Sequence, residues 1–246
     1  MKRVGPYKKL AEIYDRLMDH VDYNQWSAYV LQLITKYHPN PQTIIDLSCG
    51  TGNFLFLLYE YFKFFLAGDL SEEMIYQSWK KNKSEQIYLF VNDIQEIAVK
   101  DCQFDCALLL YDTLNYIIDE KLLKQSITEI RRILNPSGLF IFDIVTDKHC
   151  REHYADNYES EYWDRVGYSR HSYYDEKKGY QYTEFRIVKN GHTYFEEHKQ
   201  KIYSVDFLKG ALINSGFDLL ESDSQFPNDE LINGRSGRIH FVCRKM

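Results

Sequence analysis

The chain has 246 residues, 44% of them hydrophobic, with a formal net charge of -6 and a pI near 5.8. This length suits one large domain, or a core domain with an insertion, better than two independent domains. The acidic balance argues against a protein that mainly grips phosphate backbones, because that task requires a basic face.

The chain also carries no sign of export or membrane insertion. Residues 1–20 are charged and amphipathic and lack the apolar region of a signal peptide, and no later run is long enough to span a bilayer. The five cysteines are scattered and include no CxxC pair, so we predict reduced thiols rather than disulfides or a thiolate zinc site. We therefore expect a cytoplasmic protein with no membrane partner.

The first third of the chain alternates between helical and strand patterns. Apolar residues recur at helical spacing over residues 7–38 and predict two helices. The apolar run 43–47 then predicts a buried strand, 52–62 a helix and 63–70 a second strand. A serine followed by two acidic residues indicates the start of the next helix, 71–82.

The alternation continues beyond this point. The later elements are expected to be strands at 87–93, 104–112 and 139–145, helices at 119–134 and 204–217, and strands at 218–224 and 238–246. Strands that are apolar on both faces and alternate with helices indicate a parallel sheet covered on both sides. The sequence therefore predicts an α/β fold with a doubly wound, mostly parallel sheet of seven strands.

Residues 148–204 interrupt this pattern. Of the 21 tyrosines, ten lie between Tyr154 and Tyr203. Aromatic and β-branched segments alternate there with the turn signals DEKKG and NG, which predicts an antiparallel meander inserted after the fifth strand. The predicted parts are helices and a ligand-binding core (1–147), the β insertion (148–204) and the C-terminal part of the core sheet (205–246).

The turn after the first strand predicts a ligand site. Asp46 ends that strand, and Gly50 and Gly52 follow before the next helix. Such a turn brings backbone close to a ligand at the carboxyl edge of the sheet. The third glycine of the dinucleotide fingerprint is absent, as is the Lys-Ser/Thr pair of a P-loop. We therefore expect a ligand without phosphates.

Two further acids support a nucleoside ligand. Asp69 ends the second strand, where a carboxylate can accept hydrogen bonds from both ribose hydroxyls. Asp93 ends the third strand, where it could meet an adenine amino group. An acid-lined site also suits a positively charged sulfonium. Each feature alone is common and usually structural, whereas their order and spacing together are specific.

These segments resemble the class I S-adenosylmethionine-dependent methyltransferases over most of residues 7–146. The similar motifs are IIDLSCGTGNF, AGDLSEEM, VNDI, FDCALLLYDTLNYI and RRILNPSGLFIFDI, in the family's order. AEIYDRLMDHVDYNQW near the N-terminus and EEHKQKIYS at the end of the insert are similar to a small-molecule branch. That branch includes uncharacterised bacterial methyltransferases and sugar N,N-dimethyltransferases of antibiotic biosynthesis.

The resemblance implies a Rossmann-like methyltransferase fold with S-adenosylmethionine as cofactor. Ser48, Gly50 and Gly52 would cradle the methionine part, and Asp46 would order the loop. The resemblance also implies contacts from Asp69 to the ribose, from Leu70 and Met74 to the adenine face, from Asp93 and Ile94 to the adenine edge, and from Tyr14 to the methionine end.

Candidates on the acceptor side follow the fourth strand. Methyl transfer is an in-line displacement, so the protein mainly aligns the reacting atoms and excludes water. A neutral amine needs no base during attack, whereas a hydroxyl must lose its proton to a positioned group. Asp112 could orient an ammonium, remove a proton or merely cap the strand, and Asn115 lies nearby. Their segment YDTLNY departs from the N/D-P-P-Y motif of methyltransferases that act on amino groups of nucleic acids or proteins. This departure argues against a nucleobase, glutamine or asparagine as the substrate.

The insert supplies further candidates. His198 and Tyr203 could face the pocket, although a surface position on a hairpin is the simpler interpretation for His198. With Asp112 and Tyr14, His198 completes the predicted catalytic set. His149 and His153 are spaced for one helix face, but no acid or cysteine pattern accompanies them, and we predict no metal.

The tyrosines of the insert have two interpretations. As a lid, they would attract a cationic amine or the sulfonium by cation–π contact. Alternatively, they fill a half-exposed sheet, and both can hold.

The sequence thus predicts methyl transfer to a nitrogen or oxygen of a small-molecule acceptor by a monomer or homodimer. A tRNA wobble-uridine modifying relative is one alternative, which the acidic charge disfavours. The other is a catalytically idle nucleoside-binding or partner-binding module on the same fold.

Overall fold

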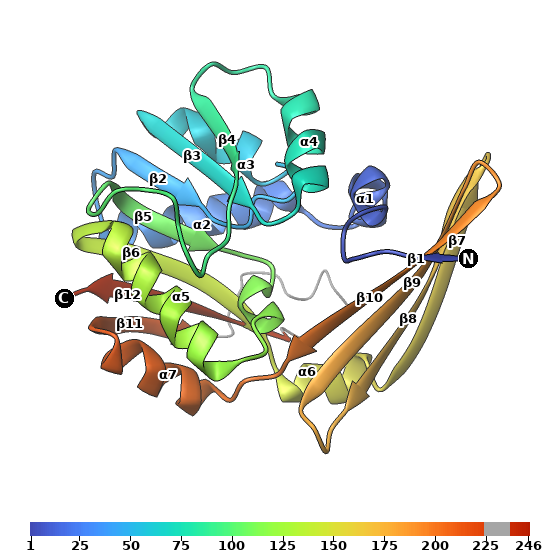
Figure 1. The fold of residues 1–246 in the computed structure, drawn as a ribbon. Helices are drawn as coiled ribbons and strands as arrows, with labels where there is room; N and C mark the ends of the chain where they lie inside the picture. The colour runs from blue at the N-terminus through green and yellow to red at the C-terminus, as the bar shows by residue number, and fades with distance from the viewer. Residues whose placement is uncertain (224–236) are drawn as a thin grey trace.

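The computed structural model describes residues 1–223 and 237–246, which form two sheets (Figure 1). The larger sheet has seven strands in the order β11-β12-β6-β5-β2-β3-β4. Its strands are β2 (Thr43–Asp46), β3 (Phe64–Asp69), β4 (Ile87–Val91), β5 (Phe104–Leu109), β6 (Leu134–Val145), β11 (Phe217–Asp223) and β12 (Arg238–Lys245). Parallel pairs join β4, β3, β2, β5 and β6, whereas β12 is antiparallel to both of its neighbours. The predicted doubly wound, mostly parallel sheet is confirmed. Ser224, predicted to end a strand, lies outside the described residues.

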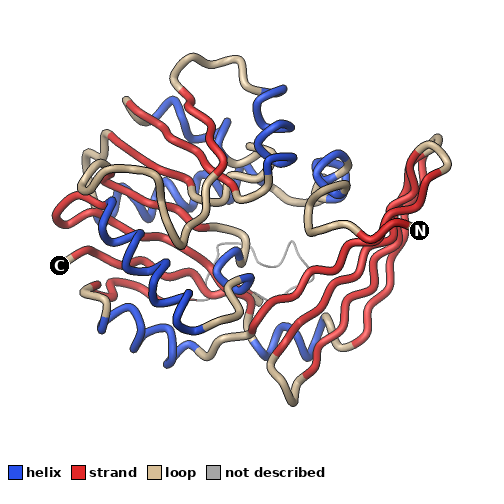
Figure 2. The backbone as a smooth tube through the Cα atoms, in the orientation of Figure 1, coloured by secondary structure: helices blue, strands red, loops and turns tan. Residues whose placement is uncertain are grey.

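Helices cover both faces of this sheet (Figures 1 and 2). One layer contains α5 (Glu120–Ile133) and α7 (Val205–Asn214), and the other contains α2 (Tyr23–Tyr37) and α3 (Leu55–Leu58), with α4 (Glu72–Lys81) beside β3 and β4. Successive side chains of a strand point to opposite faces. In β2, Ile45 therefore packs against the first layer and Ile44 against the second.

Some helices are shorter than predicted. The helix expected at 52–62 is α3 followed by one 3-10 turn, η2 (Tyr59–Tyr61). The first of the two N-terminal helices is broken into η1 (Leu10–Glu12) and α1 (Tyr14–Leu17). Apolar side chains of these two turns pack against the smaller sheet, so tertiary contacts set their conformation. The start of α4 is as predicted, since the Met74 N–H donates to Ser71 Oγ at 3.2 Å.

The smaller sheet, called here the inserted sheet, contains the predicted antiparallel meander. After α6 (Asp147–His153), the strands are β7 (Asp156–Trp163), β8 (Val166–Asp175), β9 (Tyr180–Lys189) and β10 (His192–Lys201). Each pairs with the next, and the predicted NG turn joins β9 to β10. A strand that was not predicted, β1 (Lys2–Arg3), pairs in parallel with β10. Two residues are too few to show a periodicity.

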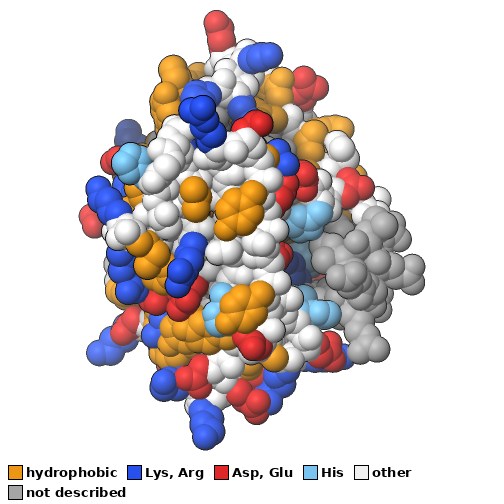
Figure 3. Space-filling view, turned by 90° about the vertical axis from the view of Figure 1, so that its right-hand side faces the viewer, with side chains coloured by type: hydrophobic (Ala, Val, Ile, Leu, Met, Phe, Trp, Pro, Cys, Tyr) orange, Lys and Arg blue, Asp and Glu red, His pale blue; other side chains and the backbone are white. Residues whose placement is uncertain are grey.

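The inserted sheet stands beside the core, and α1 lies between them (Figure 1). On this side of the molecule, hydrophobic side chains are interspersed with charged ones (Figure 3). Tyr158 and Tyr162 of β7 are exposed, whereas Tyr168 is buried against apolar side chains of η1 and α1. The tyrosines thus divide between an outer and an inner face, as the second interpretation requires, and the inner face is available to line a site.

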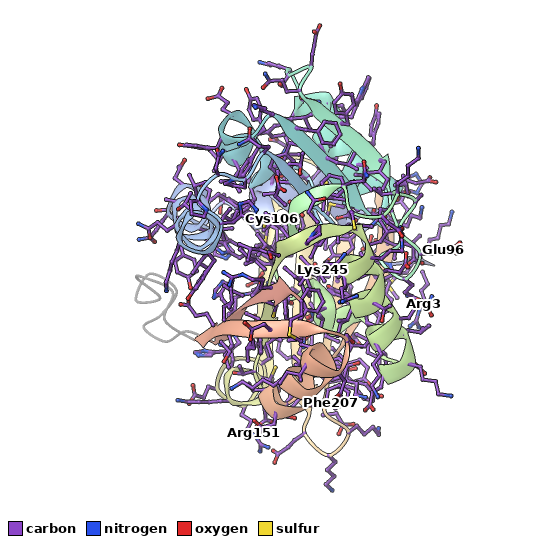
Figure 4. All side chains as sticks on the ribbon, turned by 90° about the vertical axis from the view of Figure 1, so that its left-hand side faces the viewer. Arg3, Glu96, Cys106, Arg151, Phe207 and Lys245 are labelled. Atoms are coloured by element: carbon purple, nitrogen blue, oxygen red, sulfur yellow. The ribbon has the colours of Figure 1, made fainter. Side chains whose placement is uncertain are left out.

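The cysteines of the chain are free thiols. Cys106 lies within the core of the large sheet, whereas Glu96 lies at the periphery (Figure 4). Cys102 is exposed and the other four are buried, so the described structure agrees with the prediction of reduced thiols. Among the described residues, no helix is long and apolar enough to cross a membrane.

Candidate functional site

The turn after β2 is shaped by two glycines with different roles. Gly50 and Gly52 have φ of 56° and 86°. A Cβ at Gly52 would come within 2.6 Å of the Phe56 ring and of Ser78 Oγ, so close packing requires a glycine there. A Cβ at Gly50 would meet nothing within 4 Å. Gly50 therefore borders open space, and because it has no side chain, its backbone faces that space directly.

Asp46 and Asp69 hold this turn from behind. Asp46 Oδ1 accepts the Ser48 N–H at 3.0 Å, and the two Asp69 oxygens accept the Gly50 and Ser71 N–H groups at 2.9 Å each. Burial raises the pKa of Asp46 to about 7 and that of Asp69 to about 6, although these backbone donors oppose the shift. The Asp69 carboxylate thus joins the end of β3 to the turn after β2, while Asp46 orders that turn from within.

A cavity of about 510 Å³ opens at this edge of the sheet. Its walls include most of the predicted cofactor residues, namely Tyr14, Ser48, Gly50, Asp69, Leu70, Met74, Asp93 and Ile94. Asp46 and Gly52 do not line it: Asp46 borders a smaller hollow beside the turn, and Gly52 faces Phe56 and Ser78. Eight of the ten residues that the sequence predicted to contact the cofactor therefore share one space.

The N-terminal segment and the end of β4 supply cavity residues that the sequence prediction missed. Tyr7 and Lys8 line the cavity, and Lys8 Nζ donates to Glu73 Oε1 at 2.7 Å. Asn92 is 3% exposed, and neither polar atom of its side-chain amide has a hydrogen-bond partner among the described residues. A buried amide without partners is costly unless a ligand satisfies it. From the VNDI motif, the sequence predicted roles for Asp93 and Ile94 but none for Asn92.

A second cavity of about 110 Å³ lies between the core and the inserted sheet. Four tyrosines, Tyr7, Tyr14, Tyr111 and Tyr116, line both cavities and form the boundary between them. The polar side chains on its walls include Asp112, Arg170, His198, Gln200 and Arg238. The inserted sheet therefore encloses a polar space next to the larger cavity.

Asp112 lies in a strained turn after β5. It and Tyr111 have φ of 51° and 64°, a region that costs non-glycine residues energy and is often found at functional sites. Asp143, in the otherwise apolar strand β6, holds both residues by accepting the Tyr111 N–H at 2.6 Å and the Asp112 N–H at 3.0 Å. An acid inside the run LFIFDIV was the sequence signal for this role.

The Asp112 side chain contacts one arginine and one glutamine. Its carboxylate pairs with Arg238 and accepts a hydrogen bond from Gln200. Burial raises the pKa of Asp112, and the Arg238 charge opposes this. Asp112 makes no side-chain cap of η3 (Thr113–Tyr116). It therefore faces the second cavity as one member of an ion-pair network.

The other predicted acceptor-side residues divide into two groups. Asn115 is fully buried, and its amide bonds the Lys201 carbonyl at 2.8 Å and the Val145 N–H at 3.1 Å. Tyr203 donates to the Ile117 carbonyl at 2.6 Å. Neither lines the cavities described above. His198 does line the second cavity and is 2% exposed, so the surface interpretation is wrong. Glu196, His198 and Gln200 share the inner face of β10, which sequence alone could not orient.

His149 and His153 do lie on one helix, α6, with ring centroids 4.5 Å apart. No group of three metal-ligating side chains occurs within residues 1–223 and 237–246.

Known proteins are similar to this chain in both sequence and structure. A family model described as "Methyltransferase domain" matches residues 45–157. The protein YqeM of Bacillus subtilis (strain 168), whose name assigns it provisionally to the methyltransferases, is 31% identical over 246 residues, covering 97% of each chain.

Two solved structures share the whole fold. An S-adenosylmethionine-dependent methyltransferase from Clostridium acetobutylicum ATCC 824 is 26% identical with a TM-score of 0.80, over 97% of this chain and 98% of that one. CalS10, an amino pentose methyltransferase from Micromonospora echinaspora solved with bound S-adenosylmethionine, is 14% identical with a TM-score of 0.77, over 95% and 97%. At 14% identity, the similarity to CalS10 shows the fold alone.

Proposed function

Because this chain belongs to the S-adenosylmethionine-dependent methyltransferases, we propose that it methylates a nitrogen or oxygen of a small molecule bound in the second cavity. The observation that carries this proposal is the boundary of four tyrosines between the two cavities. A cofactor in the larger cavity and an acceptor in the smaller one would meet at these rings.

The larger cavity fits the cofactor. Gly50 borders open space, Asp69 offers a half-buried carboxylate for ribose hydroxyls, and the unsatisfied Asn92 amide suits the edge of a base. Tyr14, Ser48, Leu70, Met74, Asp93 and Ile94 complete the proposed walls, with Asp46 and Gly52 holding the turn. When bound, the cofactor supplies an electrophilic methyl group. The protein's own task is then to align the acceptor and exclude water.

The walls of the second cavity favour a small polar acceptor. Its volume of about 110 Å³ suits a small molecule or one group of a larger one. Aromatic faces of Tyr14 and Tyr111 attract cationic groups, and Asp112 can orient an ammonium. CalS10 acts on an amino pentose, which also supports an amine acceptor for this chain. A formal charge of -6 disfavours a tRNA substrate.

Calorimetry followed by a turnover assay tests the proposal. We expect the chain to bind S-adenosylmethionine and to release S-adenosylhomocysteine with members of a panel of amino sugars, small amines and small alcohols. A parallel reaction with unmodified tRNA tests the nucleic-acid alternative. Absence of cofactor binding contradicts the enzyme assignment, turnover of tRNA alone contradicts the small-molecule proposal, and binding without any turnover favours the idle module.

A further inference from the structure

A row of polar side chains leads away from the boundary between the two cavities, half-buried at its tyrosine end and fully buried at its glutamate end. The Tyr7 and Tyr116 hydroxyl oxygens are 2.8 Å apart, and Tyr116 Oη is 3.1 Å from His198 Nδ1. His198 Nε2 is 3.4 Å from Glu196 Oε2. These four residues, called here the buried relay, come from the N-terminal segment, from η3 and from β10.

The far end of the relay is fixed and shielded. Glu196 is fully buried, and its Oε1 accepts the N–H groups of Lys9 at 2.5 Å and Leu10 at 3.0 Å. Its other oxygen, Oε2, lies 3.4 Å from His198 Nε2, which is an ion-pair distance, and neither of these two atoms has a hydrogen-bond partner within the described ranges. A buried carboxylate beside an imidazole stabilises the protonated ring. Such an arrangement is costly for folding alone, which suggests a use.

The hydrogen bonds have one consistent direction. If Tyr116 donates to Nδ1, the neutral His198 ring carries its proton on Nε2, which faces the Glu196 carboxylate. Burial raises the pKa of the Tyr7 and Tyr116 hydroxyls, so both stay protonated near neutral pH. The two hydroxyls can therefore transfer a proton along the row, but neither can hold an additional proton. Imidazole, whose ordinary pKa lies near neutral, is the group able to gain it.

The other groups around His198 are compatible with a neutral ring. The Tyr7 and Phe185 rings contact it in edge-to-face arrangements, with ring centroids 4.7 and 5.3 Å away. The charged residues on the same cavity wall are already in ion pairs, Asp112 with Arg238 and Arg170 with Glu159. Glu196 is therefore the charge that most directly acts on the ring.

We propose that the buried relay takes up the proton that the methyl acceptor loses, so that the acceptor is an N–H or O–H compound. This rests on the proposed function. The acceptor atom forms its bond to the methyl carbon, the sulfur keeps the electron pair of the broken bond, and the acceptor's proton passes to Tyr7 Oη. The Tyr7 proton moves to Tyr116 Oη and the Tyr116 proton to His198 Nδ1, while Glu196 balances the imidazolium charge. The same path returns the proton to water when the product leaves.

The protonation state of His198 tests the relay without any acceptor. The full chain, labelled with ¹⁵N-histidine, is titrated by NMR from about pH 6 to about pH 9, and the His198 signals are assigned by their loss in His198→Gln. We expect an Nε2–H tautomer at the basic end. Glu196→Gln should shift the Nε2 resonance of His198, because the carboxylate oxygen 3.4 Å away is replaced. Glu197→Gln, on the opposite face of the same strand and paired with Arg3, should not.

Three NMR outcomes overturn the relay: an Nδ1–H tautomer, a ring that stays protonated over the whole range, or equal effects of the two glutamate variants. Tyr116→Phe provides an independent check, because it removes the hydroxyl but keeps the ring. We expect it to shift the Nδ1 resonance of His198, and an unchanged resonance would contradict the hydrogen bond on which the proposal depends.

The first acceptor that turns over provides the kinetic test. We expect His198→Gln to lower kcat by about 100-fold or more and to remove the acidic limb of the kcat/KM profile. Its affinity for S-adenosylmethionine should stay within about twofold of wild type. His192→Gln, an exposed histidine on the same strand, is the control. A wild-type rate and pH profile in His198→Gln contradict the relay. If the wild type methylates nothing, the proposed function fails and the NMR result alone decides the relay.

Discussion

At the scale of single residues, the carboxylates of the site act mainly through backbone groups. Asp69 accepts the Gly50 and Ser71 N–H groups, so its position depends on the turn it stabilises. A carboxylate oxygen can accept more than one hydrogen bond, which leaves capacity for ribose hydroxyls. Asp69 therefore joins the loop to the proposed ligand.

We expect Asp69→Ala to weaken S-adenosylmethionine binding by about 1–3 kcal/mol, because charge-assisted hydrogen bonds are lost. Since burial raises the pKa of Asp69 to about 6, wild-type affinity should also fall as the pH drops through that value and the carboxylate gains a proton. Calorimetry at several pH values measures both effects.

Asp19→Ala, an exposed acid outside both cavities, is the matched control for this variant. An Asp69→Ala dissociation constant equal to that of wild type would show that the ribose assignment is wrong.

At the scale of elements, the turn between β2 and α3 combines a packing requirement with a binding requirement. Gly52 is closed in by Phe56 and Ser78, while Gly50 borders the cavity. Both have positive φ, so an alanine is strained at either position. Only at Gly52 does overlap add to this strain.

We expect Gly52→Ala to lower the free energy of unfolding by about 2–4 kcal/mol, from strain and overpacking together. Gly50→Ala should cost only about 1–2 kcal/mol, from backbone strain, but should weaken cofactor binding, because its methyl group enters the cavity. Urea unfolding and calorimetry on both variants separate the two effects. Equal losses of stability would contradict the difference in packing.

At the scale of the whole molecule, the N-terminal segment connects the core to the inserted sheet. Val4 and Lys9 bond to Phe195 and Glu196 of β10, while Lys8 reaches Glu73 of α4. The two hydrophobic clusters on the faces of the large sheet include no residue before Val21. The residues before Val21 thus line the cavities without contributing to the two hydrophobic clusters of the large sheet.

Deleting residues 1–9 should therefore weaken S-adenosylmethionine binding by about tenfold or more, equivalent to at least about 1.4 kcal/mol, while the core sheet stays folded. The deletion removes Tyr7 and Lys8 from the cavity wall. Calorimetry and circular dichroism check the two parts of the prediction. A chain with Lys2 and Arg3 replaced by serine keeps the length and loses an exposed ion pair and the cation–π contact of Arg3 with Phe195, both away from the cavities, so it should bind normally.

The part of the site that the sequence predicted best is the larger cavity, where we propose that the cofactor binds. Asp46, Gly50, Asp69 and Asp93 stand at strand ends, and parallel strands bring their carboxyl ends to one edge. Local patterns together with the family resemblance therefore predicted eight of the residues that line the larger cavity. Asn92 was missed because a buried amide without partners has no signature in a single sequence.

What only the tertiary structure decided is the acceptor side. Glu196 and His198 lie on an antiparallel strand whose inner face depends on register and on what packs against it. Their partners come from residues 7–10 and from Tyr116, far away along the chain. The sequence by itself determined the doubly wound sheet and the acids at the strand ends, because periodicity and strand-end spacing are local, and its motifs carried the resemblance to the family. The second cavity and the buried relay depend on contacts between distant segments, which local patterns do not encode.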